Sequence, residues 1–144
     1  MDTIQWRLDE DAVVVHSRCD VEAPIVAADA GLLEQVFVNL IVNSCDAYRD
    51  KPSDPGMPKA IEITVVEQAP MICVRVADHA GGIPDSVMAR LFEPFQTTKP
   101  GGKGTGLGLP IIYNIVNRFG GTISVRNEEG GAVVEICLPR AVSD

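Results

Sequence analysis

The apolar and polar positions between residues 29 and 48 repeat with the period of an α-helix. Large apolar side chains recur three or four residues apart and form one stripe, which consists of Leu33, Val36, Phe37, Leu40 and Ile41 and ends at Ser44. Such a stripe is typical of a helix that packs against a protein core. A second, polar stripe lies beside it and consists of Gln35, Asn39, Asn43 and Asp46. The pattern therefore predicts a core-facing helix, with Asp29 as its N-cap, that has amides next to its buried side.

Shorter patterns before and after this helix predict strands. Residues 4–8 alternate between apolar and polar side chains and residues 12–16 are rich in β-branched ones, which together predict an N-terminal hairpin. Residues 24–28 form a further short strand. After the helix, a loop of proline, glycine and aspartate leads to two alternating segments, residues 60–68 and 71–78. We therefore expect strands on both sides of the helix in the sequence.

The C-terminal half predicts two more helices and a last hairpin. A short helix spans residues 84–91, and a longer one spans residues 107–119 and ends at Gly120-Gly121, a typical C-terminal cap. Residues 122–126 and 132–138 are the arms of the hairpin. This order of elements is not an alternating βα repeat. The sequence therefore favours an α+β fold, a two-layer sandwich in which helices cover one face of a mixed, mostly antiparallel sheet.

Length, charge and cysteine content limit the class of protein. The chain has 144 residues, which fits one domain over residues 1–144. Its net charge of −8 argues against a nucleic-acid partner and against an anionic membrane surface. There is no signal peptide and no apolar run near the ~18 residues of a membrane span, so we expect a cytoplasmic protein without direct membrane insertion. The 4 cysteines form no C-x-x-C pair, and we expect reduced, mostly buried thiols.

One glycine-rich segment differs from the rest of the chain in charge. Residues 94–127 contain no aspartate or glutamate, whereas Lys99, Lys103, Arg118 and Arg126 lie among them. Within this segment, residues 104–109 read Gly-Thr-Gly-Leu-Gly-Leu and lead directly into the predicted helix. Backbone N–H groups at a helix N-terminus bind phosphate, and glycine lets a phosphate approach closely. The spacing matches neither the Walker nor the Rossmann pattern, and alone it is a weak signal that a flexible linker would also produce.

Four short motifs follow one another along the chain: Asn39-x-x-x-Asn43, Asp78-x-x-x-Gly82, Phe92-Glu93-Pro94-Phe95 and Gly104-x-Gly106-x-Gly108. Together they resemble the N, G1, F and G2 boxes of the ATP-binding catalytic domain of sensor histidine kinases, in the gyrase, Hsp90, histidine kinase and MutL superfamily. The resemblance runs from about Val26 to Leu138 and is greatest to the nitrogen-regulation and dicarboxylate-sensor type. It implies a Bergerat-type sandwich, ATP and Mg²⁺ as cofactors, and phosphate transfer to a histidine in two-component signalling.

The resemblance also implies roles for residues that contact the metal and the base. Asn43 is expected to coordinate Mg²⁺, with Asn39 beside it. Asp46 continues the same polar stripe and is expected at the nucleotide as well. Asp78 is expected to accept a hydrogen bond from the adenine amino group. Gly82 and Ile83 are expected to line the base pocket.

The phosphates are expected to bind further along the chain. The resemblance implies that Thr98 and Lys99 belong to a lid that approaches the phosphates and serves catalysis. It also implies that backbone amides hold the phosphates, namely those of Gly104, Thr105, Gly106, Leu107, Gly108 and Leu109.

The sequence departs from the family pattern at Ala80 and at Pro110, which follows the G2 box where a small residue is commoner but which a first helical turn tolerates. It also lacks a suitable acceptor histidine. Ala80 stands where the G1 box usually has its first glycine, and a positive φ there would cost on the order of 1 kcal/mol unless Gly81 takes over the turn. The only histidines are His16 and His79, and neither lies in a His-Glu-x-x-x-Pro-like context. The resemblance therefore implies a separate histidine-bearing dimerisation domain as partner, a response regulator reached through the parent kinase, and negligible self-phosphorylation.

Three other functions remain open at this point. An ATPase of the gyrase or Hsp90 kind would need a glutamate as general base where Asn39 stands. A serine kinase of the anti-sigma-factor type shares the superfamily. A nucleotide-binding or interaction module without turnover is the fourth possibility, and Ala80 is the only feature that favours it.

Overall fold

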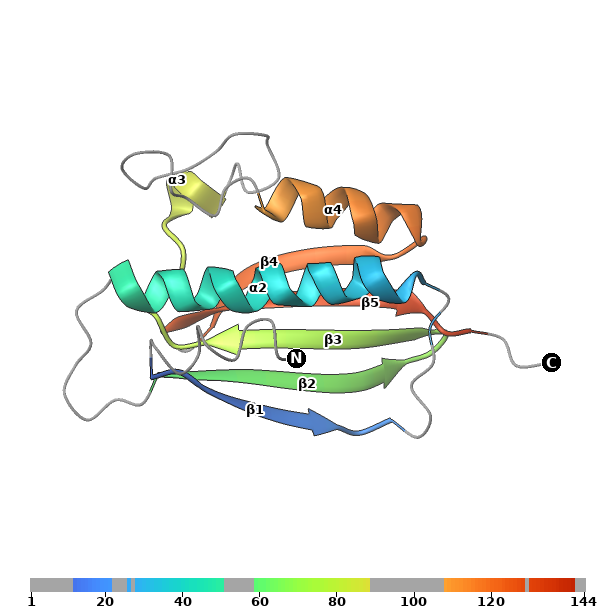
Figure 1. Cartoon of the computed structure of the whole chain (residues 1–144), viewed down its shortest axis with the longest axis horizontal. Helices are drawn as coiled ribbons and strands as arrows, with labels where there is room; N and C mark the ends of the chain where they lie inside the picture. The colour runs from blue at the N-terminus through green and yellow to red at the C-terminus, as the bar shows by residue number, and fades with distance from the viewer. Residues whose placement is uncertain are drawn as a thin grey trace.

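The computed structural model describes residues 12–21, 26, 28–50, 59–88, 108–128 and 130–141 (Figure 1). In chain order its elements are β1 (Val14–Cys19), α2 (Ala30–Asp50), β2 (Ala60–Gln68), β3 (Met71–Asp78), α3 (Asp85–Met88), α4 (Gly108–Arg118), β4 (Thr122–Glu128) and β5 (Gly131–Pro139). The bounds of β2 and β3 coincide with the two alternating segments of the sequence. Helices α2 and α4 lie within two residues of their predicted bounds.

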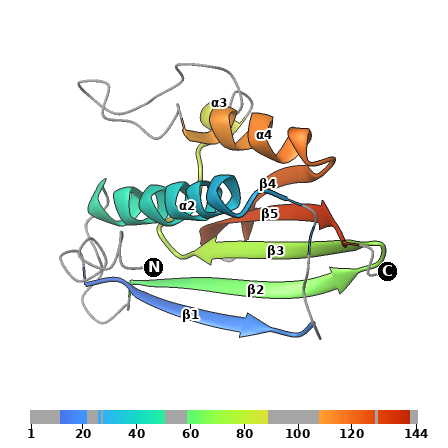
Figure 2. The same ribbon diagram turned by 45° about the vertical axis from the view of Figure 1, so that its right-hand side comes forward.

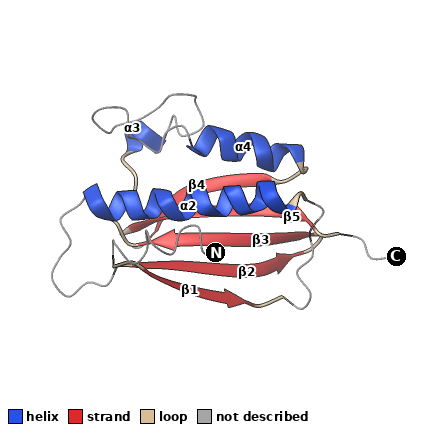
Figure 3. Ribbon diagram, viewed as in Figure 1, coloured by secondary structure: helices blue, strands red, loops and turns tan. Residues whose placement is uncertain are grey.

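The strands form one sheet in the order β1-β2-β3-β5-β4. β1 pairs parallel with β2, whereas the pairs β2–β3, β3–β5 and β4–β5 are antiparallel. Figures 1 and 3 show α2 and α4 on the same face of this sheet, and the turned view of Figure 2 shows them as a separate layer. The predicted two-layer α+β fold with a mixed, mostly antiparallel sheet is therefore confirmed.

The core lies between the two layers and uses the apolar stripes that the sequence predicts. Its largest fully buried side chains are Val36, Ile41 and Cys45 of α2, Ile112 and Val116 of α4, and Ile61 and Ile136 of the sheet. Burying an aliphatic side chain of this size stabilises a fold by roughly 1.5–3 kcal/mol. The polar stripe of α2 stays outside this core: Gln35 is exposed, and Asn39, Asn43 and Asp46 are half-buried.

Both long helices have the caps expected from their sequences. The Asp29 carboxylate accepts a hydrogen bond from the Leu32 amide at 3.0 Å, as an N-cap does. At the end of α4, the Gly120 amide donates to Asn117 O and the Gly121 amide to Val116 O, each at 3.0 Å. Gly120 has φ 74°, and this combination is a Schellman motif.

The N-terminal prediction needs correction. The first described strand begins at Val14 rather than residue 12 because Ala12 has φ 56°, a turn conformation that a strand excludes. This strand is parallel to β2, and the other arm of the predicted hairpin, residues 4–8, lies outside the described residues. Of the predicted strand 24–28, Val26 forms an isolated bridge with Arg140.

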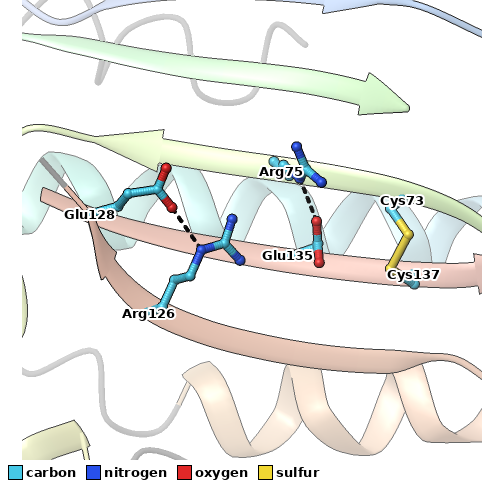
Figure 4. Close-up of polar contacts among 6 residues, drawn as sticks. All are labelled: Cys73, Arg75, Arg126, Glu128, Glu135 and Cys137. Carbon is cyan, nitrogen blue, oxygen red and sulfur yellow. Dashed lines mark hydrogen bonds and ion pairs between the residues drawn. A yellow bond between two sulfur atoms is a disulfide. The ribbon is translucent and has the colours of Figure 1, made fainter. Parts of the chain in front are cut away.

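The cysteine prediction is wrong for two of the four residues. Cys73 and Cys137 are directly opposite each other on β3 and β5, with Cα atoms 4.0 Å apart, and form a disulfide (Figure 4). Their sequence separation of 64 residues hides this proximity from any spacing rule. Cys45 is a buried thiol, as expected, whereas Cys19 is exposed.

Candidate functional site

The end of β3 holds a buried carboxylate. Asp78 is only 8% exposed. Its Oδ1 accepts hydrogen bonds from the amides of Ala80 at 3.1 Å and Ala132 at 3.3 Å, and its Oδ2 accepts one from the Ser44 hydroxyl at 3.1 Å. A carboxylate can accept about four hydrogen bonds, two at each oxygen. Oδ1 is therefore saturated, whereas Oδ2 has one acceptor position that no donor among the described residues occupies.

Ser44 and Tyr48 connect this carboxylate and the chain after it to α2. The Tyr48 hydroxyl accepts a hydrogen bond from the His79 amide at 2.8 Å and donates one to Ala60 O at 2.7 Å. Burial raises the pKa of Tyr48, although its hydrogen bonds with the backbone at His79 and Ala60 partly oppose the shift. The hydroxyl therefore stays protonated at neutral pH and can make both bonds.

The chain then forms a turn over residues 79–84, which we call the G1 turn. Gly81 has φ 94° and Gly82 has φ 81°, conformations that favour glycine. Ala12 is the only described non-glycine residue with a positive φ, so Ala80 adopts an ordinary backbone conformation. Gly81 therefore takes over the left-handed position, and Ala80 brings no backbone strain.

The β4–β5 hairpin tip, here Asn127, Glu128, Gly130 and Gly131, lies against the G1 turn. The Gly81 amide donates to Gly130 O at 2.8 Å. The Asn127 side chain accepts from the Ile83 amide at 2.8 Å and donates to Ile83 O at 2.9 Å. A Cβ atom on Gly131 would lie 1.7 Å from Asp78 O. Only glycine therefore allows the hairpin to approach β3 this closely.

The predicted site residues divide into three groups. Asp78, Gly82 and Ile83 lie together at the C-terminal end of β3 and in the G1 turn. Asn39, Asn43 and Asp46 lie on α2, the helix whose Ser44 bonds Asp78. Thr98, Lys99 and residues 104–107 lie outside the described part of the chain.

Gly108 and Leu109 form the start of α4. The Leu109 side chain is buried in the core, at 7% exposure, so only its backbone is available to a ligand. Amides in the first turn of a helix have no partner within the helix. The two residues are thus suited to contact a phosphate through their N–H groups.

Several residues of the site were not anticipated from the sequence. Ser44 ends the predicted apolar stripe, although a hydroxyl in such a stripe needs a hydrogen-bond partner and thereby indicates a buried acceptor. From the sequence, Gly130 and Gly131 lie only in the turn between the two predicted arms of the hairpin. Nothing in the sequence links Asn127 to Ile83, which is 44 residues away.

Comparisons of the sequence with a family model and with individual relatives agree with one another. A family model described as histidine kinase-, DNA gyrase B-, and HSP90-like ATPase matches residues 28–142. The chain is 34% identical to the two-component sensor PprA of Pseudomonas aeruginosa over 93% of its length. It is 40% identical to the C4-dicarboxylate transport sensor protein DctB of Rhizobium meliloti over 76% of its length. It spans only 14% of PprA and 16% of DctB.

A solved structure resembles the fold over almost all of this chain. The nucleotide-free catalytic domain of histidine kinase ThkA matches with a TM-score of 0.81 and 28% identity, covering 96% of this chain and 86% of that one. ThkA in complex with the response regulator protein TrrA matches with a TM-score of 0.76 and 26% identity, covering 97% of this chain and 38% of that one.

Proposed function

Because the chain belongs to the family of histidine kinase-, DNA gyrase B- and HSP90-like ATPases, we propose that it binds Mg-ATP and donates the γ-phosphate to a histidine on a separate dimerisation domain. Its relatives PprA and DctB are sensors and ThkA is a histidine kinase. These relatives support a histidine-kinase catalytic domain over the serine-kinase and gyrase-like alternatives. We take residues 1–144 as one such domain.

The observation on which the proposal rests is the acceptor position left at Asp78 Oδ2. Two amides and one hydroxyl hold the carboxylate in place, so its last acceptor position has a fixed direction. The adenine amino group is a donor that matches it, whereas a 6-oxo purine would present an acceptor. Gly82 and Ile83 follow within the same turn and line the base pocket.

Magnesium fits this site through amide and phosphate oxygens. No group of three or more His, Cys, Asp or Glu side chains among the described residues is placed to hold a metal ion. Mg²⁺ commonly keeps several waters and binds through few protein ligands together with nucleotide phosphates. Asn43 would supply the protein oxygen, with Asn39 and Asp46 on the same half-buried stripe of α2. The ion would neutralise charge on the phosphates.

The phosphates would bind at the start of α4. The N–H groups of Gly108 and Leu109 belong to the first turn of that helix, where the helix dipole favours an anion. Residues 104–107 would extend this cradle, and Thr98 and Lys99 would approach the phosphates from the lid.

Neither histidine of the chain is placed as a phosphate acceptor. His16 is on edge strand β1, and His79 Nε2 lies 3.9 Å from Glu62 Oε1. Asn39 also lacks the carboxylate that would activate water for rapid hydrolysis. We therefore propose that the acceptor is the dimerisation domain of the parent kinase, which passes the phosphate to a response regulator.

We propose that the domain works in the cytoplasm, where ATP is available. None of the helices that the structure describes is long and apolar enough to cross a membrane. The Cys73–Cys137 disulfide argues in the other direction, because disulfides persist mainly in oxidising compartments. Alkylation of free thiols in freshly lysed cells will show the oxidation state of this pair.

Asp78→Asn tests the base pocket. The amide oxygen of the variant can replace Oδ1 towards Ala80 and Ala132, and its NH₂ group then faces the base and the Ser44 hydroxyl. We expect ADP binding to weaken by roughly 1.5–3 kcal/mol, which is about ten- to a hundredfold, while inosine diphosphate binds better because its 6-oxo group accepts from the new NH₂. Isothermal titration of each nucleotide in the presence of Mg²⁺ measures both affinities. Asp20→Asn, which changes an exposed carboxylate just after edge strand β1, is the matched control.

Phosphate transfer is tested separately. We expect radiolabelled ATP to label the histidine of a supplied dimerisation domain in the presence of this chain, and the chain alone to remain unlabelled. Binding without transfer to any acceptor would favour the module without turnover. Acid-labile phosphate on His16 or His79 would contradict the proposed division between catalytic and acceptor domains.

A further inference from the structure

Three strands meet at the end of the sheet that carries Asp78, and one residue of the outer strand is not accounted for by the proposed function. Asn127 of β4 is directly opposite Ala132 of β5. The Ala132 amide in turn donates to Asp78 Oδ1 on β3. In Figure 1 the C-terminal end of β3 lies at the same end of the sheet as the turn between β4 and β5. The hairpin therefore contacts Asp78 through β5, and it contacts the G1 turn at Gly81 through Gly130 O and at Ile83 through the Asn127 side chain.

The Asn127 carboxamide pairs with the Ile83 backbone at two points. Its Oδ1 accepts from the Ile83 amide at 2.8 Å and its Nδ2 donates to Ile83 O at 2.9 Å. A carboxamide has one acceptor and one donor at this spacing, as a peptide group does. Aspartate has almost the same size but retains only the acceptor, so its second oxygen would face Ile83 O without a proton between them.

The position of Asn127 depends on a glycine in the turn. A Cβ atom on Gly82 would lie 2.9 Å from Asn127 Oδ1, so the carboxamide rests against the bare backbone of Gly82. Gly82 and Ile83 are the residues that line the base pocket in the proposed function. Asn127 thus holds the Ile83 backbone by two hydrogen bonds and lies against the backbone of Gly82.

We propose that Asn127 is a positioning residue for the nucleotide base. It sets the position of Ile83 relative to Asp78, since the same hairpin binds both, and it thereby sustains the preference for adenine. This inference rests on the proposed function, and it adds a residue outside the four motifs. Asn127 itself does not contact the nucleotide in this scheme.

Asn127→Ala and Asn127→Asp test the proposal on the whole chain with Mg²⁺ present. We measure the Kd for ADP by titration and the Kd for inosine diphosphate by displacement of bound ADP, well below the melting temperature of each variant. Two hydrogen bonds at an exposed site have a modest net effect. We therefore expect both variants to bind ADP roughly three- to tenfold more weakly than the unmodified chain. Inosine diphosphate, which lacks the amino group that Asp78 binds, is expected to change by less than about twofold.

The ratio of the two affinities separates positioning from stability. A general loss of stability would weaken both nucleotides alike, and that result would overturn the proposal, as would unchanged ADP binding. If Asn127→Asp behaved like the unmodified chain, side-chain size rather than the donated hydrogen bond would be responsible, and the proposal would fail. Ser124→Ala, on the same strand and exposed, is the control that should leave both affinities unchanged.

Failure of this inference is distinguishable from failure of the proposed function. If the unmodified chain bound no ADP, the proposed function would be wrong and the role of Asn127 with it. If the unmodified chain bound ADP with a clear preference over inosine diphosphate, and the variants retained that preference, only the inference about Asn127 would be overturned.

Discussion

The two faces of the sheet hold their polar side chains in opposite ways. On the face covered by helices, the Asp78 carboxylate is buried and receives hydrogen bonds from two backbone amides and from Ser44. On the other face, Arg75 of β3 pairs with Glu135 of the neighbouring strand β5, and Arg126 pairs with Glu128 on the same strand, β4 (Figure 4). Arg126 is largely exposed, and its hydrogen bond to Glu128 raises its already high pKa.

This difference indicates where the sheet is built for binding. A buried carboxylate is tolerated only if its hydrogen bonds are made, and changing its partners is costly. Exposed ion pairs contribute little, about 0–1 kcal/mol each. We therefore expect substitutions on the helix-covered face to affect stability and nucleotide binding, and substitutions of ion pairs on the open face to affect neither. The disulfide is the exception, because it also lies on the open face.

The largest expected effect comes from reducing the Cys73–Cys137 disulfide. The bond closes a loop with a sequence separation of 64 residues, and the chain-entropy relation for a loop of this size gives about 4 kcal/mol of stability. We expect the free energy of unfolding in urea to fall by about that amount in the presence of a dithiol reductant. The Cys73→Ala/Cys137→Ala variant should be destabilised similarly and should not respond to the reductant. Equal stability of the unmodified chain with and without reductant would show that the disulfide on the open face does not stabilise the fold.

Two serines on opposite faces provide the next test. Ser44→Ala removes the hydroxyl that donates to Asp78 Oδ2, and the loss of a hydrogen bond to a buried charged group should cost about 2 kcal/mol. Ser124→Ala, on the open face of β4, should change the free energy of unfolding by no more than about 0.5 kcal/mol. Chemical denaturation of both variants measures this difference. Equal effects would mean that the two faces do not differ as described.

The elements of this fold were predictable because their signals are local. The apolar stripe of α2, the alternation in β2 and β3, and Gly120-Gly121 after α4 each lie within one segment of the chain. The buried side chains Val36, Leu40 and Ile41 were identified from their spacing alone. The start of β1 differs from the predicted one because no pattern in the sequence shows that Ala12 occupies a turn with φ 56°.

The connections within the site were not predictable in the same way. Ser44 and Asp78 are 34 residues apart, Asn127 and Ile83 are 44 apart, and the two bonded cysteines are 64 apart. Each of these contacts depends on which strands become neighbours and in which register, and single-segment patterns do not contain that information. Resemblance to a family indicated Asp78, Gly82 and Ile83, but Asn127 lies outside the motifs.

Tyr48→Phe tests how the helix-covered face responds to pH. Removing the hydroxyl leaves the His79 amide and Ala60 O without their partner, which should cost about 1.5 kcal/mol at neutral pH. The pKa of Tyr48 is raised from 10.0 in the folded chain, so above about pH 10 the unfolded chain loses this proton first and folding becomes less favourable. The advantage of Tyr48 over phenylalanine should therefore shrink as the pH rises above 10. An advantage that grew with pH would contradict the direction of this pKa shift.

The smallest expected effect concerns the Arg75–Glu135 pair. Its size tests whether ion pairs on the open face are screened by solvent. The Arg75 side chain is 38% exposed and that of Glu135 16%, so the pair is part-buried and water and salt reach it from the Arg75 side. A double-mutant cycle with Arg75→Gln and Glu135→Gln isolates their coupling from the other effects of each substitution. We expect a coupling below about 1 kcal/mol that decreases further at 1 M salt, because exposed charges are screened there. A coupling of about 3 kcal/mol that persisted in high salt would place this pair among buried ones, and the contrast between the two faces would then fail.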